Sequence, residues 1–101
     1  MPLRIELRDR SGKVFGGVGE SWDSIEGMWP DLSFDTFPLL AGVDRDDDTM
    51  FNRLQLGPVA AELERLLADS PPRRREMITE MIKLCRLGSQ LPAPQLWFFG
   101  D

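Results

Sequence analysis

The stretch LRIELRDRSGKVFGGV, residues 3–18, decides the expected fold because it predicts two strands joined by a tight turn. Leu3, Ile5 and Leu7 alternate with charged residues, a period of two that is typical of a strand with one buried face. Residues 9–12 supply the turn, and residues 13–18 return as a second strand. The chain therefore begins with a predicted β-hairpin.

The middle of the chain predicts a short helix and two further strands. Asp23, followed by Glu26 three residues later, fits a capping box for a helix that Pro30 ends. Residues 37–43 are a continuous apolar run, which we interpret as a buried strand. Residues 49–54 are expected to return as a strand, so that the acidic turn between the two runs closes a second hairpin.

The second half predicts two helices and a final strand. Gly57 and Pro58 are expected to open the first helix, because proline at the first helical position lacks only a donor that would be unpaired there. The two helices are separated by Pro71 and Pro72, and residues 95–99 form an apolar strand expected in the interior of the sheet. The apolar faces of the helices comprise Val59, Leu63, Leu66 and Leu67 in the first and Met77, Ile78, Met81, Ile82, Leu84 and Cys85 in the second. The element order predicts one α+β domain, residues 1–101, with a mostly antiparallel sheet of four to five strands and its two main helices packed largely on one face.

The composition excludes several kinds of chemistry. The chain has no histidine, which excludes imidazole-based catalytic triads and the common histidine-containing zinc sites. The single cysteine, Cys85, lies at an apolar helix position and is predicted to be a buried structural thiol. We therefore expect neither an enzyme nor a cofactor, and a reducing, cytoplasmic location fits the cysteine content best.

The charge distribution points to a basic protein partner. The formal net charge is −5, which disfavours nucleic acid because a phosphate backbone needs a basic face, and no apolar stretch of about 18 residues predicts a membrane span. Residues 16–52 hold nine acidic residues and one basic residue, together with five large aromatic side chains. Acidic groups speed association with a basic partner, and aromatic anchors supply contact energy. The predicted partner-binding residues are Glu20, Trp22, Asp23, Glu26, Trp29, Asp44, Asp46, Asp47 and Asp48. The alternative is that the rings belong to the core and the acids only keep the protein soluble.

The acidic turn also has a metal-binding interpretation. Asp44, Asp46 and Asp48 alternate as the first three oxygen donors of an EF-hand calcium loop do, so a divalent-cation module is the alternative function. Thr49 stands where that loop has glycine, and Gln55 stands where it has the bidentate glutamate. A solvated turn, in which aspartate side chains accept hydrogen bonds from nearby backbone, explains the same residues. A carboxylate-based metal enzyme would need at least two acids that converge in a pocket.

Two further features suggest contacts. Arg73, Arg74 and Arg75 occupy the first turn of a predicted helix, where each exposed cation costs about 0.3–1 kcal/mol against the helix dipole. They are expected either to pair with acids such as Asp69 or those of the acidic turn, or to bind an anion. Residues 96–99 are apolar on both faces, so at a sheet edge they would pair across a homodimer.

Four segments together resemble a group of short, acidic, uncharacterised bacterial proteins. They are the apolar run that leads from Phe37 into the acidic turn, residues 49–55, residues 62–67 and residues 96–101. The resemblance implies no role for any residue. In size and acidity the chain is also similar to the immunity proteins that neutralise bacterial toxins. This similarity concerns the general kind of protein and no particular residue.

Overall fold

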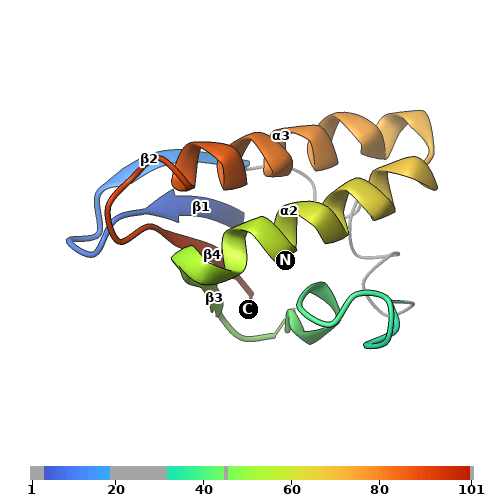
Figure 1. Cartoon of the computed structure of the whole chain (residues 1–101), viewed down its shortest axis with the longest axis horizontal. Coiled ribbons are helices and arrows are strands. Elements are labelled where there is room, and N and C mark those ends of the chain that lie inside the picture. Colours follow the sequence, from blue (N-terminus) through green and yellow to red (C-terminus); the bar gives the residue numbers. More distant parts are fainter. Residues whose placement is uncertain (1–3, 19–31, 45, 101) are drawn as a thin grey trace.

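The computed structural model describes residues 4–18, 32–44 and 46–100, apart from the side chain of Arg73. Figure 1 shows the elements in their spatial arrangement. Within these residues the elements in chain order are β1 (Arg4–Arg8), β2 (Val14–Val18), the 3-10 helix η2 (Leu40–Gly42), β3 (Thr49–Phe51), α2 (Arg53–Ala68), α3 (Pro72–Gly88) and β4 (Gln95–Phe99). The predicted helix after Asp23 lies outside the described residues.

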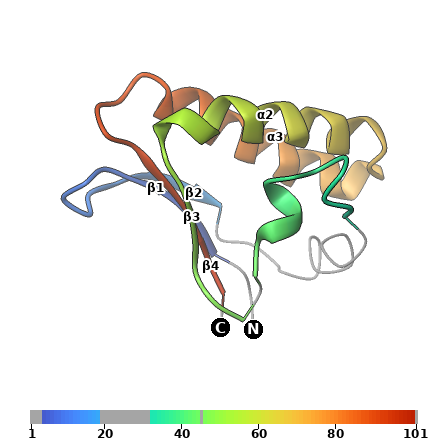
Figure 2. The ribbon, with the colours of Figure 1, turned by 60° about the horizontal axis from the view of Figure 1, so that its bottom comes forward.

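The four strands form one antiparallel sheet in the order β2-β1-β4-β3. Ile5 stands opposite Phe98 and Leu7 opposite Leu96, so the two central strands turn the same alternate positions toward the helices. Helices α2 and α3 lie side by side over that face of the sheet (Figure 2). The predicted α+β class, with two C-terminal-half helices on one face, is confirmed.

The core fills the space between the sheet and the two helices. Phe98 on the central strand β4 is completely buried, and its ring meets the ring of Phe51 edge to face at 5.6 Å. Leu63 of α2 and Met81 of α3 are buried on the helix side of this core. The predicted helical stripes are confirmed, since only Leu67 and Met77 among their residues are half-buried rather than buried.

The prediction of a buried strand at residues 37–43 is wrong. This segment forms turns and the 3-10 helix Leu40–Gly42, and it inserts Leu40 and Val43 into the core. The Leu39 and Leu40 N–H groups donate to a side chain of α2, and the N–H groups of residues 41–43 donate to carbonyls within the segment, so these groups do not pair with a neighbouring strand. The second hairpin is therefore also wrong, because β3 pairs with β4.

Helix α2 begins earlier than the glycine–proline pair indicates. Asn52 caps it, because its side chain accepts the Leu54 N–H at 2.9 Å while the Gln55 side chain accepts the Asn52 N–H at 2.8 Å. This reciprocal capping box fixes the first turn, and Pro58 consequently lies inside the helix. The strand predicted over residues 49–54 is thereby shortened to Thr49–Phe51.

Strand β4 lies between β1 and β3, as its apolar sequence predicts. Both of its edges are paired, so the homodimer that would form through a free edge of residues 96–99 is excluded. Within the described sheet, the free edges belong to β2 and β3.

Candidate functional site

The acidic turn forms an exposed loop that joins the 3-10 helix to β3. Asp44, Asp46, Asp47 and Asp48 are all exposed. One oxygen of Asp44 accepts the Asp46 N–H at 2.8 Å, and one oxygen of Asp47 accepts the Asp48 N–H at 2.7 Å. None of the four carboxylates forms an ion pair with another described residue. We call these four residues the acidic loop, whose negative charge faces water.

An exposed aromatic ring lies beside the acidic loop. Phe34 is 66% exposed, the second-largest exposure among the large apolar side chains of the described chain. A Cβ placed on Gly42 would lie 3.9 Å from the Phe34 ring, so the ring lies close to Gly42, which precedes Asp44 by two residues. Asp35 is exposed next to it. Phe34, Asp35 and the acidic loop together form what we call the acidic surface.

The structure describes only part of the predicted partner surface. Glu20, Trp22, Asp23, Glu26 and Trp29 lie outside the described residues. Of the aromatic side chains counted with them, the described Phe37 is half-buried and Phe51 belongs to the core. Phe34 is therefore the described ring of this segment that is available to a partner.

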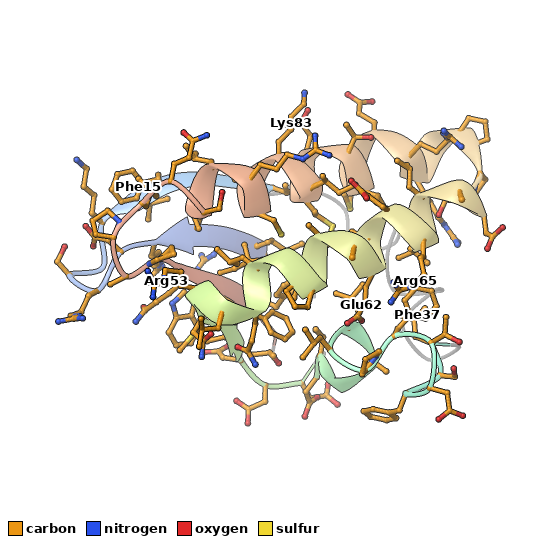
Figure 3. All side chains as sticks on the ribbon, viewed as in Figure 1. Phe15, Phe37, Arg53, Glu62, Arg65 and Lys83 are labelled. Carbon is orange, nitrogen blue, oxygen red and sulfur yellow. The ribbon has the colours of Figure 1, made fainter. Side chains whose placement is uncertain are left out.

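A buried carboxylate holds the segment that carries the acidic surface. Glu62 of α2 is only 2% exposed, and it points from the helix toward the 3-10 helix (Figure 3). Its Oε1 accepts the Leu40 N–H at 2.9 Å and the Leu39 N–H at 3.1 Å, and its Oε2 lies 3.1 Å from the same Leu39 nitrogen. Glu62 thus supplies acceptors for two amides at the start of the 3-10 helix.

Arg65, one helical turn further along α2, makes a second attachment. Its Nη2 donates to the Thr36 carbonyl at 2.9 Å, and its guanidinium carbon lies 5.8 Å from the centre of the Phe37 ring. We call Glu62 and Arg65 the α2 clamp. Sequence reasoning missed it, although Glu62 is a charged residue next to Leu63 in the middle of the predicted apolar stripe, which is a signal of a buried, hydrogen-bonded carboxylate.

The metal-binding interpretation finds no converged ligand set. Among residues 4–18, 32–44 and 46–100, no three carboxylate or thiol side chains are grouped so that they could hold a metal ion. Asp44 and Asp47 instead accept backbone N–H groups of their own loop. The geometry thus matches the solvated-turn alternative for Asp44, Asp46 and Asp48, and cation binding by these residues stays a prediction.

Within the arginine triplet, Arg75 contacts α2 through a carbonyl and not through a carboxylate. Arg75 Nη1 donates to the Leu67 carbonyl at 3.3 Å, near the end of α2 where the helix dipole favours a cation. Arg74 Nε is buried without a hydrogen-bond partner, and neither side chain forms an ion pair with Asp69. Anion binding by Arg73, Arg74 and Arg75 stays a prediction.

Cys85 is buried in the core, as the sequence predicts. Burial raises the pKa of its thiol to about 12, because the thiolate would lose its hydration there. The thiol is therefore protonated at neutral pH and is a poor nucleophile.

We expect Cys85 to resist thiol reagents in the folded protein. At pH 8 its thiolate fraction is about a thousandfold below that of a cysteine in the unfolded chain. Ellman's reagent should therefore react within minutes in guanidinium chloride and only on the timescale of unfolding without it. Equal rates in the two conditions would show that the thiol is accessible.

No family model, curated protein or solved structure matches the chain. None of the described helices has the length and apolar character needed to cross a membrane.

Proposed function

We propose that the protein is a non-enzymatic binding module that engages a basic protein through the acidic surface. The carrying observation is that the carboxylates of the acidic loop are exposed and form no ion pair among the described residues, while the exposed Phe34 ring lies close to Gly42, two residues before the loop begins. Charges left without internal partners raise the association rate with a basic surface, and an exposed aromatic ring near them supplies contact energy. An immunity-type inhibitor of a basic enzyme is the form we favour, acting in the cytoplasm.

The attachment of the acidic surface to α2 supports this proposal. Glu62 and Arg65 fix residues 36–40, which connect Phe34 and Asp35 to the acidic loop. A surface whose backbone is held before binding loses less conformational entropy when the partner arrives. The arrangement therefore suits recognition by a preformed surface.

Removing the loop charges tests the proposal. We expect a variant with Asp44, Asp46, Asp47 and Asp48 replaced by asparagine to associate with its basic partner at least about tenfold more slowly at low salt. Asparagine keeps the carbonyl oxygens that accept the Asp46 and Asp48 amides, so the loop shape should persist. The partner is first isolated from the source cell on the immobilised full chain, and its association rates are then measured by surface plasmon resonance at two salt concentrations.

The matched control changes the same number of charges on the helices. Glu64, Asp69, Glu76 and Glu80 are exposed, so their conversion to the corresponding amides changes the net charge equally. This control should associate almost as fast as the wild-type chain. The proposal fails if no basic protein is retained, or if the loop variant and the helix control lose equal amounts of rate.

A further inference from the structure

The face of the sheet opposite α2 and α3 is not covered by any described helix (Figure 2). The alternate positions of the central strands point to this side, with Arg4, Glu6 and Arg8 on β1 and Trp97 and Phe99 on β4. Both aromatic side chains are half-buried there, whereas their neighbour Phe98 is completely buried on the helix side. We call this side the open face.

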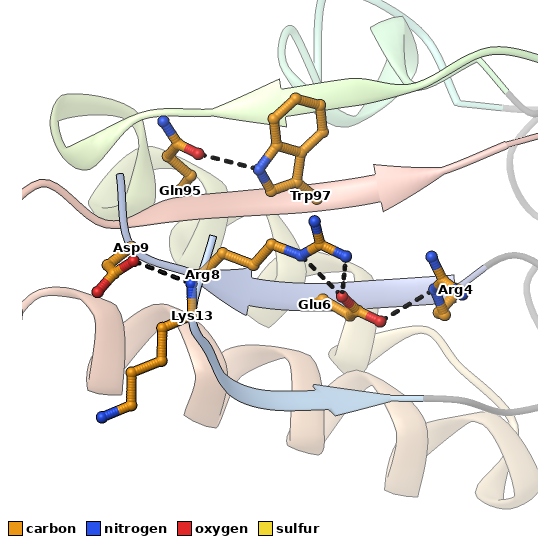
Figure 4. A network of polar contacts seen from close by, with 7 residues as sticks. All are labelled: Arg4, Glu6, Arg8, Asp9, Lys13, Gln95 and Trp97. Carbon is orange, nitrogen blue, oxygen red and sulfur yellow. Dashed lines mark hydrogen bonds and ion pairs between the residues drawn. The ribbon is translucent and has the colours of Figure 1, made fainter. Parts of the chain in front are cut away.

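The open face carries a stacked aromatic pair, Trp97 and Phe99, beside arginines. Figure 4 shows Trp97 together with Arg4, Glu6 and Arg8. The rings of Trp97 and Phe99 are nearly parallel, at 7° with centres 5.5 Å apart. The guanidinium carbons of Arg4 and Arg8 each lie 4.7 Å from the centre of the Phe99 ring. Glu6 fixes both arginines, through contacts of 3.0 Å to Arg4 Nε and 2.6 Å to Arg8 Nη2.

A cavity of about 220 Å³ is lined by two residues that neighbour Trp97, Met50 and Gln95. Its wall includes Arg10, Arg53 and Gln95, and the Gln95 Oε1 accepts the Trp97 indole N–H at 3.1 Å. Met50, the cross-strand neighbour of Trp97, also lines the cavity. Gln95 and Met50 therefore link the indole to the wall of the cavity.

This surface is cationic in a chain whose net charge is negative. It holds Arg4, Arg8, Arg10 and Arg53 against Glu6 and the adjacent Asp9, whereas the whole chain carries −5. Asp9 accepts hydrogen bonds from Ser11 and from the Lys13 N–H, which lower its pKa and tie its charge to the turn. Arg10 and Arg53 form no ion pair within the described part of the chain, so two guanidinium groups at the cavity lack an anion.

We propose that the open face binds single-stranded nucleic acid, with a base stacked against Trp97 and an adjoining phosphate held by Arg10 and Arg53 at the cavity. Base stacking on an aromatic side chain combined with a cationic groove is the general basis of single-strand recognition. The net charge that disfavours nucleic acid is an average over the whole chain, and the arginines of the open face give it a local positive charge. A duplex, whose bases are already stacked on each other, cannot use the indole in this way.

Fluorescence anisotropy with a labelled dodecathymidylate and the full chain at low salt tests this proposal. We expect saturable binding that Trp97→Ala weakens by about tenfold or more, because one stacked base is lost. Arg10→Ala and Arg53→Ala should each weaken binding and reduce the slope of log K against log salt by about one phosphate contact. Arg86→Ala is the control, because it removes an arginine of α3 that is 68% exposed. It should change neither the affinity nor the salt slope.

Each alternative result counts against the proposal. Absence of binding at 100 μM protein would overturn it, as would equal affinity for a duplex of the same length or an unchanged affinity in Trp97→Ala. Competition by poly-L-glutamate as strong as by unlabelled oligonucleotide would assign the open face to an acidic protein. Thermal melting establishes that each variant is folded. Gln95→Ala removes the partner of the indole N–H and part of the cavity wall, and it should weaken binding less than Trp97→Ala does. Because the acidic-loop variant leaves the open face intact, it should still bind the oligonucleotide.

Discussion

Replacement of Phe98 by alanine is expected to lower the free energy of unfolding by about 3–5 kcal/mol. Phe98 is completely buried on a central strand, and its ring packs edge to face against Phe51 beneath both helices. The substitution removes the whole ring and leaves a cavity that surrounding side chains fill only partly. A domain of this size has a total stability of about 5–15 kcal/mol, so the variant should be close to unfolding at 37 °C.

Phe34→Ala is the matched control, because it removes the same atoms from a side chain that is 66% exposed. Its unfolding free energy should change by no more than about 0.5 kcal/mol. Urea denaturation followed by far-UV circular dichroism measures both variants, and an equal loss in the two would contradict the position of Phe98 in the core. If the proposed function is correct, Phe34→Ala should weaken partner binding while leaving the free energy of unfolding nearly unchanged.

The sheet and its covering helices were predictable because their patterns are local and regular. Alternation at Leu3, Ile5 and Leu7 identifies β1, and the helical repeat that includes Leu63 identifies the buried side of α2. These periods report directly which side of an element faces the core. The apolar run of residues 96–99 likewise indicates a strand in the interior of the sheet, where β4 lies between β1 and β3.

Residues 37–43 show where local pattern fails. A short apolar run has no period, so it cannot distinguish a strand from a compact turn that inserts one or two side chains into the core. The deciding contact is Glu62, which lies more than twenty residues away and accepts the amides of Leu39 and Leu40. The start of α2 was missed for a different reason, because Pro58 is a conspicuous signal whereas the Asn52 and Gln55 capping box is a subtle one.

The candidate sites were predictable only in part. The acidic loop is obvious in the sequence, but the exposure of Phe34 beside it depends on how residues 32–44 pack. The open face was missed because Arg4, Arg8, Trp97 and Phe99 come from opposite ends of the chain and meet only when β1 pairs with β4. Net charge is a poor guide here, since it averages a cationic face with an acidic one.

Glu62→Ala is expected to lower the free energy of unfolding by about 3 kcal/mol and to release the segment that carries the acidic surface. The substitution leaves the Leu39 and Leu40 amides without their acceptor, and Leu40 is completely buried. Each unsatisfied buried donor costs about 1–3 kcal/mol. Relief from burying a carboxylate offsets part of that cost, so the loss should be smaller than the sum for two amides.

Two further variants separate the hydrogen bonds from the charge. Glu62→Gln keeps an acceptor oxygen but loses the carboxylate, so it should cost about half as much as alanine. Glu64→Ala, on the same helix, removes only an exposed ion pair with Arg86 and should cost less than about 1 kcal/mol. Hydrogen exchange gives the local readout: the Leu39 and Leu40 amides should lose protection in Glu62→Ala while the β1 and β4 amides keep theirs. Unchanged protection of those two amides would mean that the 3-10 helix is held without the clamp, and the preformed acidic surface would then need another support.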